Sequence, residues 1–182
     1  MKDNLKIIGV LTGVCMLCGF VLAFVFSSAK DRIEQNQKDY IRRAIYNLAP
    51  QAESVKEEQK KDSLVYFLSD SSGNDLGYAF LCEGLGYQGP IKILFAADKK
   101  LKTILGIEII ESNETPGLGA KINEPEFKIM FSGVPVSRRL EVVKTAAEKK
   151  NEIQAITSAT VSSKAVVRIV NAGIDKLKEV LE

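Results

Sequence analysis

The 182-residue chain has no histidine, no tryptophan and only three cysteines. Without histidine it has no Ser-His-Asp triad, no Cys-His dyad and no imidazole ligand for a metal or a haem. Three thiols are too few for a four-cysteine iron–sulfur cluster or an all-cysteine zinc site. If the chain carries out redox chemistry by itself, its redox centre is therefore expected to be organic.

The chain also lacks an excess of either positive or negative charge. The sequence has 25 basic and 23 acidic residues, which gives a formal net charge of +2. Proteins that bind nucleic acids usually present a basic face, so this near balance argues against nucleic acid as a partner. We also find no acid and base side chains at a convincing spacing, and the chain is not expected to hold a complete active site of its own.

One long apolar run, from Ile7 to Phe26, carries no charge. A helix of this length spans roughly 30 Å, the thickness of the hydrocarbon core of a bilayer. Lys6 and Lys30 flank the run and can reach the lipid headgroups. We therefore predict a membrane anchor over residues 1–29, in contact with the lipid bilayer. The alternative is a signal peptide cleaved at the small residues 27–29, although the run is longer than the usual apolar core of such a peptide.

Two of the three cysteines, Cys15 and Cys18, lie in the apolar run with C-x-x-C spacing. In a soluble protein this spacing is typical of a reactive dithiol. At membrane depth the formation of a thiolate is disfavoured, so we interpret both as small apolar packing residues. Cys82 is then the only cysteine outside the run, and no disulfide is expected within the soluble part.

The rest of the chain is long enough for one ordinary domain. Apolar residues recur at helical spacing from Lys30 to Leu48, which predicts a juxtamembrane helix that Pro50 ends. The charge-rich segment 51–62 is interpreted as a linker or an exposed loop. We assign residues 30–62 to this helix and linker, and residues 63–182 to the folded domain.

Alternating apolar residues after position 63 predict strands, and two of the connections between them have the composition of hairpin turns. The last apolar stripe has helical spacing and predicts a C-terminal helix capped by Ser162 or Ser163. Several antiparallel strands followed by a packing helix make this an α+β domain. The strands are expected at 64–68, 76–82, 91–97 and 101–110, with weaker candidates at 140–145 and 152–156.

A glycine-rich segment, Glu114-Thr115-Pro116-Gly117-Leu118-Gly119-Ala120-Lys121, follows the longest predicted strand. Its two glycines allow the backbone to approach a flat ligand closely, and the proline stiffens the entry to the segment. The alternative is an ordinary turn that ends the strand, because Pro-Gly is common in turns.

A second segment, Thr157-Ser158-Ala159-Thr160-Val161-Ser162-Ser163, leads into the predicted C-terminal helix and has five hydroxyls in seven residues. The start of a helix offers unpaired N–H groups and the positive end of the helix dipole, which suit an anion such as phosphate. The alternative is simple helix capping, for which a single serine is enough.

Together these segments resemble the FMN-binding domain shared by the G subunit of the Rnf complex and the C subunit of the Na+-translocating NADH:quinone reductase. Gly86-Tyr87-Gln88-Gly89-Pro90-Ile91 is similar to the family's GYxGPI segment, and residues 114–119 (ETPGLG) match its signature without a break. Residues 157–160 are similar to its S-G-A-T flavinylation motif. The three motifs occur in the family's order and extend through most of the soluble part.

The resemblance implies covalently bound FMN. In the family, a dedicated flavin transferase links the FMN phosphate to the threonine of the motif, which is Thr160 here. Ser158 and Ser162 are then expected to contact the phosphate or to be read by the transferase, and Glu114 or Thr115 to lie near the polar edge of the isoalloxazine ring. The implied cofactor-binding residues are Tyr87, Glu114, Thr115, Gly117, Leu118, Gly119, Ser158, Ala159, Thr160, Val161 and Ser162.

Two positions depart from the family pattern. Ser158 stands where the motif usually has glycine, which adds a side chain near the attachment point. Ser112 stands where many relatives have a histidine, two residues before the glutamate of ETPGLG, so any role of that histidine is absent here. Thr160, the hydroxyl that the attachment requires, is present.

The resemblance implies a membrane-anchored electron-transfer subunit of the Rnf complex, an ion-translocating ferredoxin:NAD oxidoreductase. The chain is then part of an enzyme, a translocase. Its expected partners are the other membrane and iron–sulfur subunits of the complex and, for maturation, the flavin transferase. The short chain favours the Rnf G subunit over the longer C subunit of the quinone reductase, which is one alternative. A membrane-tethered binding or assembly module with the same fold and no redox role is the other.

In the family the domain faces away from the cytoplasm. The resemblance therefore implies a single-pass protein of the inner cell membrane with its soluble domain on the extracytoplasmic side. The lysines and arginines on the two sides of the apolar run favour, if anything, the opposite orientation.

Overall fold

The computed structural model describes residues 2–61 and 63–182. Helix α1 (Lys2–Leu48) opens the chain, and its part before Ile41 is a unit separate from the rest. The stretch from Lys6 onward has a mean hydropathy of 2.5 in its most apolar part, none of which is buried. By length and composition this helix can cross a membrane, as the apolar run predicted.

The second unit, Ile41–Glu182, starts within the last turns of α1. The helix expected from residue 30 forms part of α1, which ends two residues before Pro50. Strand β1 (Ser54–Lys60) corrects the linker or exposed loop expected over 51–62. β1 lies at the edge of a sheet and its mostly charged side chains are largely exposed, so the apolar alternation that identifies a strand is missing from its sequence.

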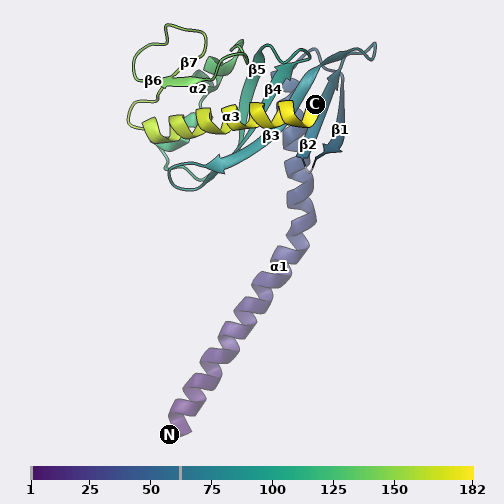
Figure 1. Ribbon diagram of the computed structural model, residues 1–182. Helices are drawn as coiled ribbons and strands as arrows, with labels where there is room; N and C mark the ends of the chain where they lie inside the picture. Colours follow the sequence, from purple (N-terminus) through teal and green to yellow (C-terminus); the bar gives the residue numbers. More distant parts are fainter. Residues whose placement is uncertain (1, 62) are drawn as a thin grey trace. The chain divides into compact units, whose positions relative to one another are not determined.

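Five strands form one antiparallel sheet in the order β1-β2-β3-β4-β5, so that each pairs with its neighbours in sequence (Figure 1). The two predicted hairpins are confirmed as β2–β3 and β4–β5. In the first, Asp70 Oδ1 accepts hydrogen bonds from the N–H groups of Ser72 and Asn74, both at 2.8 Å, which closes the turn. The strands are β2 (Ser63–Ser69), β3 (Asp75–Leu85), β4 (Pro90–Asp98) and β5 (Ile104–Ser112).

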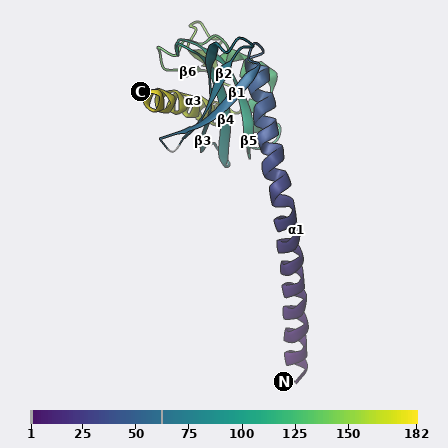
Figure 2. The same cartoon turned by 90° about the vertical axis from the view of Figure 1, so that its right-hand side faces the viewer.

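Both faces of this sheet are covered, because successive side chains of a strand point to opposite faces. On β4, Phe95 belongs to the core shared with helix α3 (Thr160–Leu181), whereas Leu94 and Ala96 belong to a second core shared with residues 41–52. Figure 2 shows α3 and the end of α1 on opposite sides of the sheet. Packing on the sheet therefore sets the position of α3 on one face.

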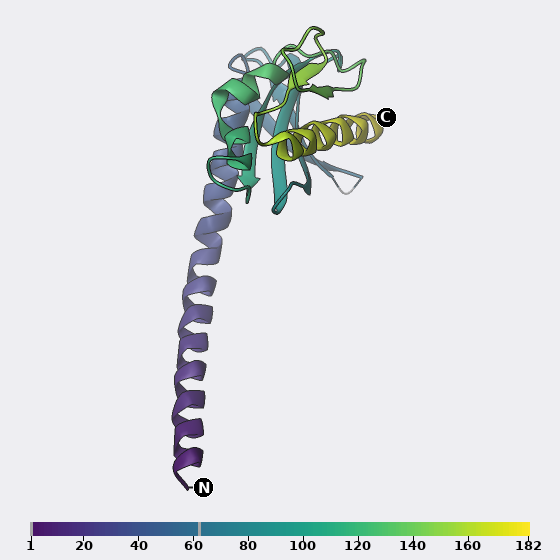
Figure 3. The same cartoon turned by 90° about the vertical axis from the view of Figure 1, so that its left-hand side faces the viewer.

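The segment that follows β5 forms three short helical turns that the sequence did not predict. Pro125 occupies the start of the middle turn, a position that tolerates its missing N–H. Phe127 and Phe131 are buried and pack edge to face, with ring centroids 5.5 Å apart. Figure 3 shows these turns in green beside β5. They are η1 (Gly119–Asn123), α2 (Pro125–Lys128) and η2 (Ile129–Phe131).

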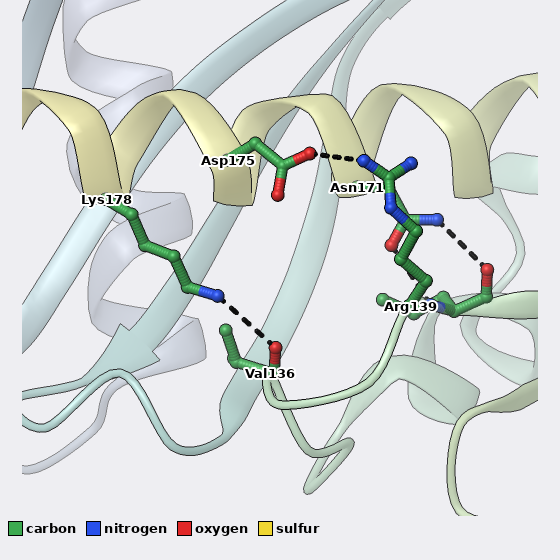
Figure 4. A network of polar contacts seen from close by, with 6 residues as sticks. Val136, Arg139, Asn171, Asp175 and Lys178 are labelled. Carbon is green, nitrogen blue, oxygen red and sulfur yellow. Dashed lines mark hydrogen bonds and ion pairs between the residues drawn. The ribbon is translucent and has the colours of Figure 1, made fainter.

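The two weaker strand candidates form β6 (Glu141–Val143) and β7 (Glu152–Gln154), a separate parallel pair that is shorter than expected. A polar network ties the segment before β6 to α3 (Figure 4). The Asn171 side chain accepts a hydrogen bond from the N–H of Leu140 and donates one to its carbonyl, both at 3.0 Å. These two bonds satisfy the backbone groups that a neighbouring strand would otherwise pair with. The Arg139 guanidinium pairs with Asp175 at 2.7 Å.

Helix α3 carries the predicted apolar stripe, but it begins at Thr160, so the predicted cap at Ser162 or Ser163 is wrong. The residue before the helix is Ala159, which makes no side-chain cap, and both serines are buried within the first turn. The hydroxyls of these serines face the protein because packing on the sheet sets the rotation of the helix.

Gly173 marks the close approach of α3 to the sheet. A Cβ at this position would lie 2.9 Å from both Cys82 Sγ and Phe95 Cε1. Burial in this contact raises the pKa of the Cys82 thiol to about 12, so the thiol stays protonated at neutral pH. The glycine therefore sets the distance between the helix and strands β3 and β4.

We predict that Gly173→Val lowers the free energy of unfolding by about 2 kcal/mol or more, because the side chain does not fit between α3 and the sheet. Ala172→Val, at the adjacent exposed position, is expected to cost only ~0.5 kcal/mol through helix propensity. Denaturant titration of the full chain in detergent micelles measures both changes. Equal losses in the two variants would contradict the close packing.

Candidate functional site

A cleft of about 370 Å³ lies at the start of α3. It is formed by the turn between β3 and β4, the ETPGLG segment after β5 and the first turn of α3. All the residues expected to bind a cofactor line it except Gly117. The lining residues are Tyr87, Glu114, Thr115, Leu118, Gly119, Ser158, Ala159, Thr160, Val161 and Ser162.

The Glu114 carboxylate joins the three segments of the cleft. Its Oε1 accepts hydrogen bonds from the backbone N–H groups of Tyr87, at 2.6 Å, and Gln88, at 3.1 Å. Its Oε2 accepts a hydrogen bond from the Ser162 hydroxyl at 2.5 Å. The residue is only 5% exposed. Glu114 is therefore positioned by three donors from two other segments, and it in turn positions them.

Two glycines leave the space that this carboxylate occupies. A Cβ on Gly86 would collide with Glu114 Oε1, and a Cβ on Gly119 would collide with Glu114 Oε2 and Ser162 Oγ. Gly117 has a φ of +75°, a conformation that side chains disfavour, and its position is otherwise open. Close packing on the carboxylate thus accounts for Gly86 and Gly119, and a tight turn accounts for Gly117.

Further contacts hold the ETPGLG segment in place. The Thr115 hydroxyl donates to Gln88 Oε1 at 2.6 Å, which adds a side-chain contact to the backbone contacts of Glu114. The Ser112 hydroxyl accepts the N–H of Glu114 at 3.3 Å. Ser112 thus contributes to the local geometry of the segment.

The first turn of α3 presents free donors to the cleft. The first N–H groups of a helix have no partner within the helix, and Ala159 supplies no cap. These groups belong to residues 160–162, which line the cleft. Because α3 has 22 residues, its dipole adds positive potential at this end. The site is therefore suited to an anion such as a phosphate group.

Ser163 stabilises the loop that precedes this turn. Its hydroxyl accepts the N–H of Ile156 and donates to the carbonyl of Ala159, both at 3.0 Å. Within this loop Ser158 has a φ of +68°, in the left-handed region that favours glycine. The backbone conformation explains in physical terms why a glycine suits this position.

The remaining wall of the cleft is apolar. The side chains of Tyr87, Leu118 and Val161 line it and are unusually exposed for their size, Tyr87 by 71%. Such side chains suit a flat aromatic ligand lying along the cleft. Within residues 2–61 and 63–182, no group of three or more cysteine, aspartate or glutamate side chains is arranged to hold a metal ion.

Comparison with known proteins identifies the family. Residues 86–175 match the family model of the FMN-binding domain. The G subunit of the ion-translocating oxidoreductase complex of Methanosarcina acetivorans is 30% identical, over 96% of this chain and 94% of that one. The G subunit of the proton-translocating ferredoxin:NAD(+) oxidoreductase complex of Clostridium ljungdahlii is 31% identical, over 97% and 94%. The chain belongs to the G-subunit family of ion-translocating oxidoreductases.

The fold of this G-subunit family member is also found in a solved structure. The C subunit of the Na(+)-translocating NADH-quinone reductase from Parabacteroides distasonis superposes with a TM-score of 0.57 and is 26% identical, over 65% of this chain and 62% of that one. The predicted α+β fold, with an N-terminal apolar helix, an antiparallel sheet and a C-terminal helix, is confirmed. All three motifs that predicted the FMN-binding domain lie within the residues matched by its family model.

Two residues that organise the site were not among those predicted. Gln88 contacts Glu114 through its backbone and Thr115 through its side chain. It occupies the open position of the GYxGPI segment, so the motif carries no signal for it. Ser163 lies in the hydroxyl-rich segment, and this position was the one feature of the sequence that could have predicted its role in the site.

We predict that Ser158→Gly raises the free energy of unfolding by about 1 kcal/mol in the protein without cofactor, because glycine removes the cost of the left-handed conformation. Ser158→Ala keeps that cost and is expected to lie within about 0.5 kcal/mol of the parent protein. Thr157→Gly is the matched control, since Thr157 does not have a positive φ and glycine there only adds freedom to the unfolded chain. Denaturant titration measures the change in the free energy of unfolding for each variant. A change of the same sign in Ser158→Gly and Thr157→Gly would contradict this explanation.

Proposed function

We propose that this chain is a membrane-anchored electron carrier that holds FMN through a phosphoester to the hydroxyl of Thr160. It acts as a subunit of an ion-translocating ferredoxin:NAD oxidoreductase complex. The observation that carries the proposal is the position of Thr160. It is the first residue of α3 and lines a cleft that has free N–H donors on one side and apolar side chains on the other.

The residues of the cleft fit the parts of FMN. The phosphate would lie at the start of α3, where the N–H groups of residues 160–162 and the Ser158 hydroxyl can donate hydrogen bonds. Leu118, Val161 and Tyr87 would contact the isoalloxazine ring. When bound, FMN supplies a centre that takes up and releases electrons one or two at a time, and the chain orients that centre.

The neighbouring hydroxyls support Thr160 as the attachment point. Ser162 donates to Glu114 and Ser163 donates to Ala159, so both are engaged in holding the site together. Thr157 does not line the cleft. Among the described residues no partner occupies the Thr160 hydroxyl. This leaves its oxygen available to displace the leaving group of an activated flavin phosphate on the transferase, with loss of the hydroxyl proton.

The helix α1 would anchor the carrier in the bilayer, beside the other membrane and iron–sulfur subunits of the complex. We place the domain on the extracytoplasmic side of the inner membrane, with a flavin transferase needed for maturation. This sidedness suits the covalent bond, which would keep FMN attached where free FMN is scarce. The names of the relatives, each the G subunit of such a complex, support this assignment over the C subunit of the quinone reductase.

We predict that the full chain, made together with the flavin transferase, retains a fluorescent flavin after denaturing gel electrophoresis. Thr160→Ala should lose this signal completely because no oxygen remains to hold the phosphate. Thr160→Ser keeps a hydroxyl and should restore a measurable part of the signal. Thr157→Ala, which removes a neighbouring hydroxyl outside the cleft, is the matched control and should label like the parent chain.

Retention of the signal by Thr160→Ala would contradict the attachment site. A parent chain that folds, stays colourless and gains no mass of one FMN would contradict the redox function itself. That second result would favour a membrane-tethered binding or assembly module with the same fold.

A further inference from the structure

Among the residues that the structure describes, Glu114 is the one Asp or Glu that lines the cleft, and no lysine or arginine lines it. Its carboxylate is buried, and none of the ion pairs found among the described residues includes it. Its three partners are the N–H groups of Tyr87 and Gln88 and the hydroxyl of Ser162. All three donate, which is what an ionised carboxylate requires, since it can only accept. The cleft therefore contains a fixed negative charge that forms no ion pair with a lysine or arginine among the described residues, and its nearest positive potential is the start of the α3 dipole.

Such a charge acts more strongly here than on the surface. Exposed charges are screened by water and salt, whereas a buried charge keeps much of its field over several ångströms. A neutral hydrogen-bonding environment stabilises the carboxylate without cancelling its charge. Any group in the cleft that becomes more negative is consequently destabilised by Glu114.

We propose that the Glu114 carboxylate lowers the reduction potential of the flavin held in this cleft, an inference that rests on the proposed function. Two-electron reduction of an isoalloxazine with uptake of one proton leaves the ring with an added negative charge. Coulomb repulsion from the carboxylate opposes that charge. Glu114 thus has two separate effects: its hydrogen bonds shape the cleft, and its charge makes the bound flavin a stronger reductant.

Glutamine separates these two effects because it preserves the shape and the hydrogen bonds. The amide oxygen of Glu114→Gln can accept from the N–H groups of Tyr87 and Gln88, as Oε1 does now. Its NH₂ group can donate to the Ser162 hydroxyl, which is able to act as an acceptor. The charge is lost, and the hydrogen bond with Ser162 reverses its direction while its partners stay the same.

The experiment measures the midpoint potential of the covalently loaded, full-length protein in detergent at pH 7, by titration against redox dyes. Glu114→Gln should shift the potential to a more positive value. Glu111→Gln is the matched control, because Glu111 lies near the end of β5, three residues before Glu114, and is exposed, outside the cleft and paired with Lys92. It should leave the potential unchanged.

A Glu114→Gln potential equal to that of the parent protein, or an equal shift in Glu111→Gln, would overturn the inference. If Glu114→Gln does not fold or takes up no flavin, Ser162→Ala decides. It keeps the charge but removes a donor that partly offsets it, so the potential should become more negative; no shift or a positive one would contradict the inference.

Failure of the proposed function is recognised separately. A parent protein without covalent flavin, seen on the denaturing gel before any titration, refutes that function together with the inference. A loaded parent protein whose potential does not respond to Glu114 refutes the inference alone.

Discussion

The site depends on one buried carboxylate, that of Glu114, which accepts three hydrogen bonds. They join residues 86–90, the ETPGLG segment and the first turn of α3, which are far apart in the sequence. Hydrogen bonds to a charged group are worth about 1.5–3 kcal/mol each, and a buried donor left without a partner costs about 1–3 kcal/mol. Because Gly86 and Gly119 leave just enough room for the carboxylate, neither the contact nor the surrounding backbone can shift independently. The shape of the cleft follows from this constraint.

The rest of the domain places the segments so that this contact can form. The sheet has a core on each face, one shared with α3 and one shared with residues 41–52. Gly173 lets α3 approach β3 and β4 closely, and Asn171 holds the segment before β6 against the same helix. These contacts set both the position and the rotation of α3. As a result Ser162 faces Glu114, while Thr160, two residues earlier, lines the open cleft.

Much of the fold was predictable from local patterns. Alternating apolar residues identified β2 to β5, and helical spacing identified α3, because these elements bury one face. β1 was missed since its charged edge-strand sequence lacks that pattern, and the turns over 119–131 were missed since they are too short to show a period. Motif resemblance predicted the residues of the cleft. The contact of Glu114 with Ser162 spans 48 positions, and the left-handed backbone of Ser158 depends on how α3 begins, so neither follows from local sequence.

We propose that the cleft positions one hydroxyl of the five in this segment, that of Thr160, for the attachment of FMN. Trypsin releases this segment as one peptide, residues 151–164, since Lys150 and Lys164 bound it. Tandem mass spectrometry of this peptide from the flavin-loaded chain tests the claim most directly. The account predicts that N-terminal fragment ions ending at Ala159 have their unmodified mass and that those extending through Thr160 carry one FMN. FMN mass on Thr157, Ser158, Ser162 or Ser163, or a peptide without FMN, would contradict it.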